Sequence, residues 1–346
     1  MKLVGVSTAF KMHIYKVAPS LPISENMNQK FSENLVSAIK DALPDKTNVA
    51  IYLMDLLSLG KEAVYRRLRG TVSFDIEESA LISRDLNISL DHIIGMKSED
   101  KAIFNLNLIQ RSDILDDYCR FIDNYIQTFR RLQLYSNSKC YSAYNVIPLS
   151  FYTQYDLISK FYWYKWLYQM EGFENTTQFS QFSFPTRVSD IHKSFIQESR
   201  FIDSSSFVLA RNIFVSLARD VDFFSRLNLL TKAEVQQIKI ELIDLLTNLE
   251  SVAASGIWNG GKEVFFYLSN MNFESSYTYL ECSDFELSIL RVFSFGSIHS
   301  LKDQVCKVHK DWLDSLKRSS TLISRSGDVH RAEYFNEQKE AINTIL

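Results

Sequence analysis

The chain contains few of the residues that form disulfides, zinc sites or tight turns. Its 346 residues include 4 cysteines, 6 histidines, 5 prolines and 10 glycines. The cysteines are scattered without a C-x-x-C pair, and no H-E-x-x-H motif occurs. We therefore expect free thiols in a reducing cytosol and no bound metal or cofactor. The scarcity of glycine and proline favours long helices with few tight turns.

Long apolar runs and a strong net charge are also lacking. No apolar run approaches the roughly 18 residues of a membrane span. The N-terminal stretch is interrupted by Lys11 and lacks a cleavage site typical of a signal peptide. The net charge is −3, so any attraction to DNA must come from a local cluster of basic residues. We expect a cytoplasmic protein without a membrane partner.

Catalytic motifs are missing as well. The chain has no G-x-S-x-G, no P-loop and no G-x-G-x-x-G. We therefore expect that the protein is not an enzyme. A catalytic domain tethered to DNA is an alternative, and it would require a cleft with clustered ionisable groups.

What the chain does contain is a regular series of short amphipathic segments. Residues 1–26 have weak periodicity, and we interpret them as a peripheral leader. From about residue 28, apolar residues recur with helical periodicity and predict five short helices within residues 27–97. The first ends before Pro44, Thr47 or Asn48 can cap the second, and Asp75 can cap the fourth.

The third of these helices, in LGKEAVYRRLRG (59–70), has a basic outer face. Val64 and Leu68 lie four residues apart, so both can point into a core. Residues 61–69 contain four basic side chains and one acidic side chain, a net charge of +3, whereas residues 27–92 contain 8 basic and 10 acidic, a net of −2. The remaining side chains of the helix then face outward: Lys61, Glu62, Tyr65, Arg66 and Arg69.

The order of these segments resembles a known DNA-binding family. LMDLLSLGKEAVYRRLRG followed by SFDIEESALISRDLNISLDHIIG is similar to the Cro/C1-type (XRE-type) helix-turn-helix, over about residues 30–95. The resemblance implies that the third helix reads the major groove. Ser58 occupies a turn position where the family usually has glycine. The resemblance assigns groove contacts to Lys61, Glu62, Tyr65 and Arg66, and phosphate contacts to Arg67 and Arg69.

Residues 98–346 contain both helical and β-rich segments. The order of these segments resembles the long C-terminal region of uncharacterised bacterial regulators. We predict an α+β domain in which NGGKEVFFYLSNMN, SSYTYLEC and FELSILRVF form a small three-stranded antiparallel sheet. The fold class of the whole chain is thus expected to be mainly α. A heptad spacing over residues 115–132 fits either a dimer interface or packing within the domain. The aromatic run FYWYKWLYQM (161–170) fits core packing or the lining of an effector pocket.

These observations lead to one principal hypothesis and two alternatives. We expect a sequence-specific, DNA-binding transcriptional regulator that binds double-stranded DNA as a homodimer, with residues 98–346 dimerising or sensing a small-molecule or protein effector. In the second hypothesis the helix-turn-helix makes protein contacts in an interaction scaffold. The third is the enzyme domain tethered to DNA.

Overall fold

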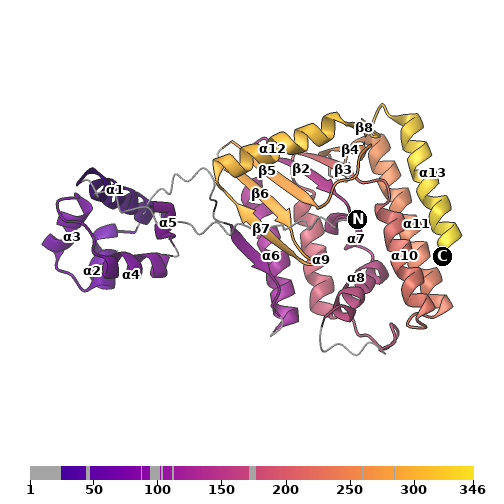
Figure 1. Ribbon diagram of the computed structural model, residues 1–346, viewed down its shortest axis with the longest axis horizontal. Helices are drawn as coiled ribbons and strands as arrows, with labels where there is room; N and C mark the ends of the chain where they lie inside the picture. Colours follow the sequence, from indigo (N-terminus) through magenta and orange to yellow (C-terminus); the bar gives the residue numbers. More distant parts are fainter. Residues whose placement is uncertain are drawn as a thin grey trace, which may run out of the picture. The chain divides into compact units, whose positions relative to one another are not determined.

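The chain divides into two compact units, residues 1–101 and 102–346, which Figure 1 shows in indigo to violet and in magenta to yellow. The sequence placed this boundary between residues 97 and 98. Of the predicted leader, residues 25 and 26 belong to the first helix, and residues 1–24 lie outside the described part. This computed structural model describes residues 25–43, 47–86, 88–93, 102, 104–110, 113–170, 177–258, 260–283 and 285–346.

The N-terminal unit is a cluster of short helices around a small core. Asn48 accepts hydrogen bonds from the backbone N–H groups of Ala50 and Ile51 and so caps the second helix. The core side chains that are fully buried are Leu35, Ile39, Leu53, Val64 and Ile82. The helices are α1 (Glu25–Ala42), α2 (Val49–Leu57), α3 (Lys61–Leu68), α4 (Ile76–Leu86) and α5 (Leu90–Ile93).

The C-terminal unit is built on one sheet with the strand order β1-β7-β6-β5-β2-β3-β4-β8. The strands are β1 (Asn105–Leu108), β2 (Lys139–Tyr144), β3 (Ser204–Leu209), β4 (Glu263–Ser269), β5 (Tyr277–Cys282), β6 (Phe285–Arg291), β7 (Gly296–Ser300) and β8 (Ser320–Leu322). The helices are α6 (Ile114–Gln133), α7 (Leu149–Tyr152), α8 (Asp156–Tyr168), α9 (Thr186–Ser199), α10 (Ile213–Arg226), α11 (Lys232–Ser255), α12 (Asp303–Arg318) and α13 (Asp328–Ile345).

This sheet corrects the expected fold class. The sequence predicted a mainly α protein with a small antiparallel sheet, but the described residues form an eight-stranded mixed sheet, and the fold is α/β. Strands β2, β3 and β4 run parallel to one another, while β4 pairs with β8 and not with β5. The expected three-stranded sheet is wrong because β4 joins β3 through the helical crossover of α10 and α11, which parallel strands require.

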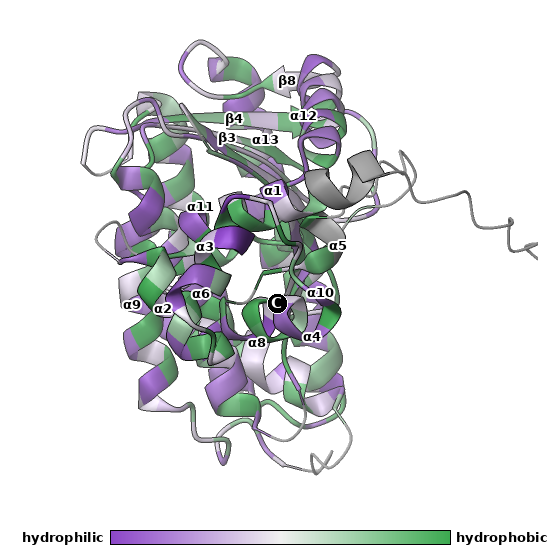
Figure 2. Ribbon diagram, turned by 90° about the vertical axis from the view of Figure 1, so that its left-hand side faces the viewer, coloured by the Kyte–Doolittle hydropathy of each residue, from purple (hydrophilic) through white to green (hydrophobic). Residues whose placement is uncertain are grey.

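Helices cover both faces of the sheet (Figure 1). On β2, Cys140 belongs to the large core beneath α6–α11, whereas Ala143 belongs to a smaller core with Cys306 and Leu313 of α12. Successive strand residues point to opposite faces, so both faces of the central strands are apolar. The helices are banded purple and green in Figure 2, as expected where one side meets the sheet and the other meets solvent.

The heptad spacing in α6 serves packing within the C-terminal unit. Tyr118, Ile122, Phe129 and Leu132 are all buried in its large core. The face that the spacing predicts exists, but it is covered by the same chain, so it cannot form a dimer interface. The aromatic run of α8 likewise packs into this core, with Phe161 fully buried. Among the described residues, no helix combines the length and hydrophobicity needed to cross a lipid bilayer.

Candidate nucleic-acid interface

The turn between α2 and α3 is tight even though it lacks glycine at its first position. Ser58 adopts the left-handed conformation, with φ of 54°, and its backbone N–H donates to the Met54 carbonyl at the end of α2. Gly60 returns to extended backbone as the N-cap of α3. A serine in the left-handed region is strained, so the packing of the two helices holds it there.

One side of α3 is fixed to the core of its unit. Val64 is fully buried and Leu68 is partly buried against the same core, as their four-residue spacing predicts. Gly70 ends the helix with φ of 74°, a conformation that favours glycine. The Thr71 N–H donates to the Arg66 carbonyl at 3.0 Å. The helix is therefore held at both ends and along its apolar side.

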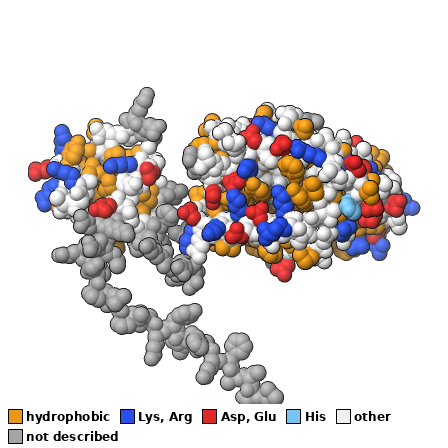
Figure 3. All heavy atoms as spheres, turned by 90° about the horizontal axis from the view of Figure 1, so that it is seen from above, with side chains coloured by type: hydrophobic (Ala, Val, Ile, Leu, Met, Phe, Trp, Pro, Cys, Tyr) orange, Lys and Arg blue, Asp and Glu red, His pale blue; other side chains and the backbone are white. Residues whose placement is uncertain are grey.

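The opposite side of α3 is open to solvent and basic. Lys61, Glu62, Arg66 and Arg69 are exposed, and Tyr65 is 39% exposed. At 100° per residue these five positions span one continuous arc of the helix. In Figure 3 the blue side chains of the N-terminal unit gather at the end that α3 occupies in Figure 1.

Arg67 lies away from this face and pairs within the unit. Its Nε donates to Oε2 of Glu78 at 2.8 Å, and its Nη2 donates to Oε1 at 2.7 Å. The two side chains are only 15% and 12% exposed. Glu78 also accepts the Asp75 N–H at 3.1 Å, and Asp75 accepts the Glu78 N–H at 2.8 Å. Arg67 thus joins α3 to the capping box of α4, and the structure does not bring it to the position expected for a phosphate contact.

The exposed α3 face therefore has three cations, Lys61, Arg66 and Arg69, and one carboxylate, Glu62, a net charge of +2. No ion pair joins these cations to another described residue. The Arg69 Nε donates to the Tyr65 carbonyl at 3.2 Å. Hydrogen-bonding groups of both kinds, guanidinium, phenol and carboxylate, are thus available to a ligand that lies along the helix.

Sequence reasoning missed the residues that fix α3 from behind. The spacing of Asp75 and Glu78 is typical of a capping box, so the contact of Glu78 with Asp75 could have been predicted. Its pairing with Arg67 joins residues 11 apart across two helices and has no local pattern. A similar contact, Tyr52 to Asp85 between α2 and α4, was missed for the same reason.

The described residues contain no cluster of three side chains suited to a metal ion. Comparison of the chain with protein-family models, curated proteins and solved structures found no match. The interpretation of the α3 face therefore depends on its own geometry and charge.

Proposed function

We propose that the protein is a sequence-specific DNA-binding transcriptional regulator and that α3 is its recognition helix. The observation that supports this most strongly is the exposed arc of Lys61, Glu62, Tyr65, Arg66 and Arg69 on a helix held rigidly from behind. An α-helix with its side chains is about 10–12 Å across, so the eight-residue α3 can lie in a major groove about 12 Å wide.

Different residues of the arc suit different contacts. Arg66 lies near its edge, and its guanidinium forms no ion pair with any residue that the structure describes, so it can donate two hydrogen bonds to the O6 and N7 atoms of a guanine. Glu62 can accept from a cytosine amino group, and Tyr65 can donate or accept. Lys61 and Arg69 lie at the two ends of the helix, where they can contact phosphates and position the helix in the groove.

The small charge of the face favours binding by two copies. A net of +2 on α3, within a unit of net −2 over residues 27–92, provides few phosphate contacts per chain. A homodimer would double them and place its recognition helices about 34–36 Å apart, one turn of DNA. In this proposal the C-terminal unit dimerises or senses an effector.

The test uses the full chain and a DNA site obtained by in vitro selection from random duplexes. Arg66→Ala should weaken binding by about 1–3 kcal/mol and relax the preference at one base pair. Arg69→Ala should weaken all sequences alike and lower the salt slope by about one. The matched control is Arg84→Ala, which removes an exposed arginine from α4. Because Arg84 is not part of the α3 arc, this variant should bind within about twofold of the wild type.

Two results would contradict this proposal. One is selection that enriches no sequence from the random duplexes. The other is an Arg66→Ala and Arg69→Ala protein that binds the selected site as tightly as wild type. Either would favour the interaction scaffold, in which the same face meets a protein.

A further inference from the structure

The sheet of the C-terminal unit has an open edge at β1. Among the described residues, β1 pairs with β7 alone, so the backbone N–H and C=O groups along its other side are not paired with a strand. Proteins commonly protect such an edge with charged residues or proline, but residues 102–110, AIFNLNLIQ, contain neither. The opposite edge, β8, is shorter and lies between Arg318 and Arg325 in the sequence. The β1 edge can therefore accept a further strand.

An apolar row of side chains ends at this edge. Asn107 is buried and donates from its side chain to the Phe121 carbonyl of α6 at 3.2 Å, so the neighbouring Leu106 points to the face that carries α12. Leu106 is 70% exposed there. Ile298 of β7 and Leu290 of β6 continue the row in register; both are half-buried and belong to neither core of the unit.

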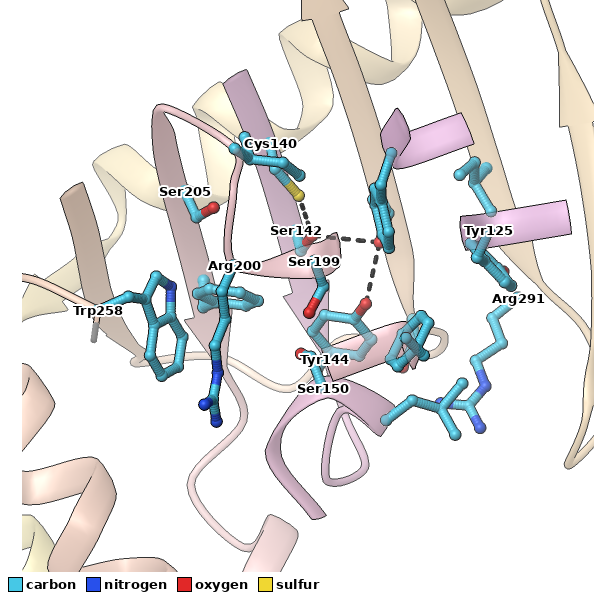
Figure 4. A pocket seen from close by; sticks show the side chains of 18 residues that line it. Tyr125, Cys140, Ser142, Tyr144, Ser150, Ser199, Arg200, Ser205, Trp258 and Arg291 are labelled. Atoms are coloured by element: carbon cyan, nitrogen blue, oxygen red, sulfur yellow. Dashed lines mark hydrogen bonds between the residues drawn. The ribbon is translucent and has the colours of Figure 1, made fainter. Parts of the chain in front are cut away.

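The other face of the sheet is closed. It carries the large core beneath α6 and the following helices. Figure 4 shows Tyr125, Tyr144 and Arg291 around a cavity within that core, and its volume of about 60 Å3 is far below the roughly 300–1,000 Å3 of a typical ligand pocket. A partner that binds beside β1 therefore meets the strand edge and the apolar row on the α12 face.

We propose that the β1 strand of a second copy of this chain pairs antiparallel with β1, about a two-fold axis at Leu106. An antiparallel pair of identical strands is self-complementary, as a two-fold interface requires. Leu106 then lies opposite the partner's Leu106, and Phe104 lies opposite the partner's Leu108. All of these side chains are on the α12 face. The apolar rows of the two copies thus join across one continuous sheet.

Backbone hydrogen bonding allows this axis. In an antiparallel pair, alternate residues direct both their N–H and their C=O toward the same neighbouring strand. If Leu106 is directed away from β7, it exchanges both hydrogen bonds with the partner's Leu106. If Asn105 and Asn107 are directed away instead, Asn105 exchanges them with the partner's Asn107. The two-fold axis is the same in both cases.

The choice of a second copy as the partner rests on the proposed function. The small charge of the α3 face favours two copies on DNA, and the heptad face of α6 is buried in its own unit, so it cannot join them. Residues 94–101 link the two units, and eight residues span at most about 29 Å. Two such links that begin at adjacent β1 strands can reach recognition helices about 34–36 Å apart.

The first experiment measures sedimentation of the full chain without DNA, and wild type should be a dimer at tens of micromolar. Leu106→Lys places like charges opposite each other and should raise the dissociation constant at least about a hundredfold. Leu106→Glu should do the same. An equimolar mixture of the two variants should dimerise again, because opposite charges then face each other across the axis. The control, Ile240→Lys on α11, changes an apolar residue that is 67% exposed and should dimerise like wild type.

Cysteine substitutions test the register of the pairing. Leu106→Cys should give a disulfide-linked dimer on oxidation, because residues directly opposite each other lie about 4.5–5.5 Å apart, within the usual disulfide range of about 4.4–6.8 Å. Asn105→Cys is the matched control. It is equally accessible, but its two copies would be diagonal neighbours about 7–8 Å apart and should cross-link far less. Both substitutions are made with Cys282→Ser, since the other three thiols are buried.

Several outcomes would overturn this inference. One is a wild-type chain that stays monomeric at tens of micromolar, and another is a Leu106→Lys chain that dimerises as tightly as wild type. Cross-linking through Asn105→Cys that equals or exceeds that through Leu106→Cys would exclude the axis at Leu106. The DNA proposal fails separately: a dimer that enriches no DNA sequence contradicts the proposed function alone, whereas a monomer that binds its selected site contradicts this inference alone.

Discussion

Two adjacent arginines of α3 should respond to the same substitution in opposite ways. Arg67 is paired with Glu78 through two hydrogen bonds, and both side chains are almost fully covered. Arg66 is exposed and lies on the proposed DNA face. We therefore expect Arg67→Ala to reduce stability, and Arg66→Ala to reduce DNA affinity at unchanged stability.

The size of the Arg67 effect follows from its contacts. Removing one partner of a charged hydrogen bond costs about 1.5–3 kcal/mol, and breaking a fully buried pair costs about 3–5 kcal/mol. Glu78 still accepts the Asp75 N–H and can bind water once the arginine is gone. We therefore expect Arg67→Ala to lower the free energy of unfolding by about 2 kcal/mol. For a unit of this size, that corresponds to a fall of about 8–16 °C in melting temperature.

The tryptophan distribution makes the measurement selective. Unfolding of the N-terminal unit changes far-UV circular dichroism but not tryptophan emission, because all four tryptophans lie beyond residue 101. Arg67→Ala should lower the melting temperature of the circular dichroism transition that has no counterpart in tryptophan emission, and should leave the tryptophan transition unchanged. Arg66→Ala should change the stability of the N-terminal unit by less than about 0.5 kcal/mol. A double-mutant cycle with Glu78→Ala should give a coupling of about 1–2 kcal/mol. An Arg67→Ala protein that melts like wild type would refute this reasoning.

Three further predictions concern the same two units. Val64→Asp should unfold the N-terminal unit, because it buries an unpaired charge; an unchanged circular dichroism spectrum would contradict this. Ser58→Gly should raise the stability of that unit by about 1 kcal/mol, since glycine adopts the left-handed conformation without strain, and a lower melting temperature would count against it. Burial lowers the pKa of His192 to about 3 and that of His309 to about 4. Below the ordinary histidine pKa of about 6.5, the unfolded chain therefore binds more protons than the folded chain. The C-terminal unit should therefore lose stability as pH falls from about 6.5 toward 4; His309→Gln should flatten that dependence of the tryptophan transition, and an equally steep profile in this variant would argue against the assignment.

Local sequence patterns predicted the helices and their caps well. Asn48 caps α2, and Asp75 accepts the Glu78 N–H at the start of α4. Each of these depends on residues within four positions of one another, and their chemistry does not require knowledge of the rest of the fold.

The strands at the centre of the sheet could not be found in the same way. FVLARNIFVSLARDVDFFSRL reads as one helix, but residues 207–209 belong to β3 and α10 begins at Ile213. Central parallel strands are buried on both faces and lack the alternation that marks a half-exposed strand. Strand β2 has the sequence KCYSAY, which is too short and too polar to be identified without its neighbours. Their pairing depends on residues about 65 positions apart.

The heptad spacing in α6 likewise predicted an apolar helix face but not what covers that face. Heptad spacing identifies which residues share one side of a helix, but either a second chain or the same chain can cover that side. Here an eight-stranded sheet requires helices over its apolar face, and α6 is used for that purpose. If two copies bind DNA, they must therefore associate through another surface. The weak charge of each α3 face still favours two copies, because phosphate contacts contribute to affinity in proportion to their number.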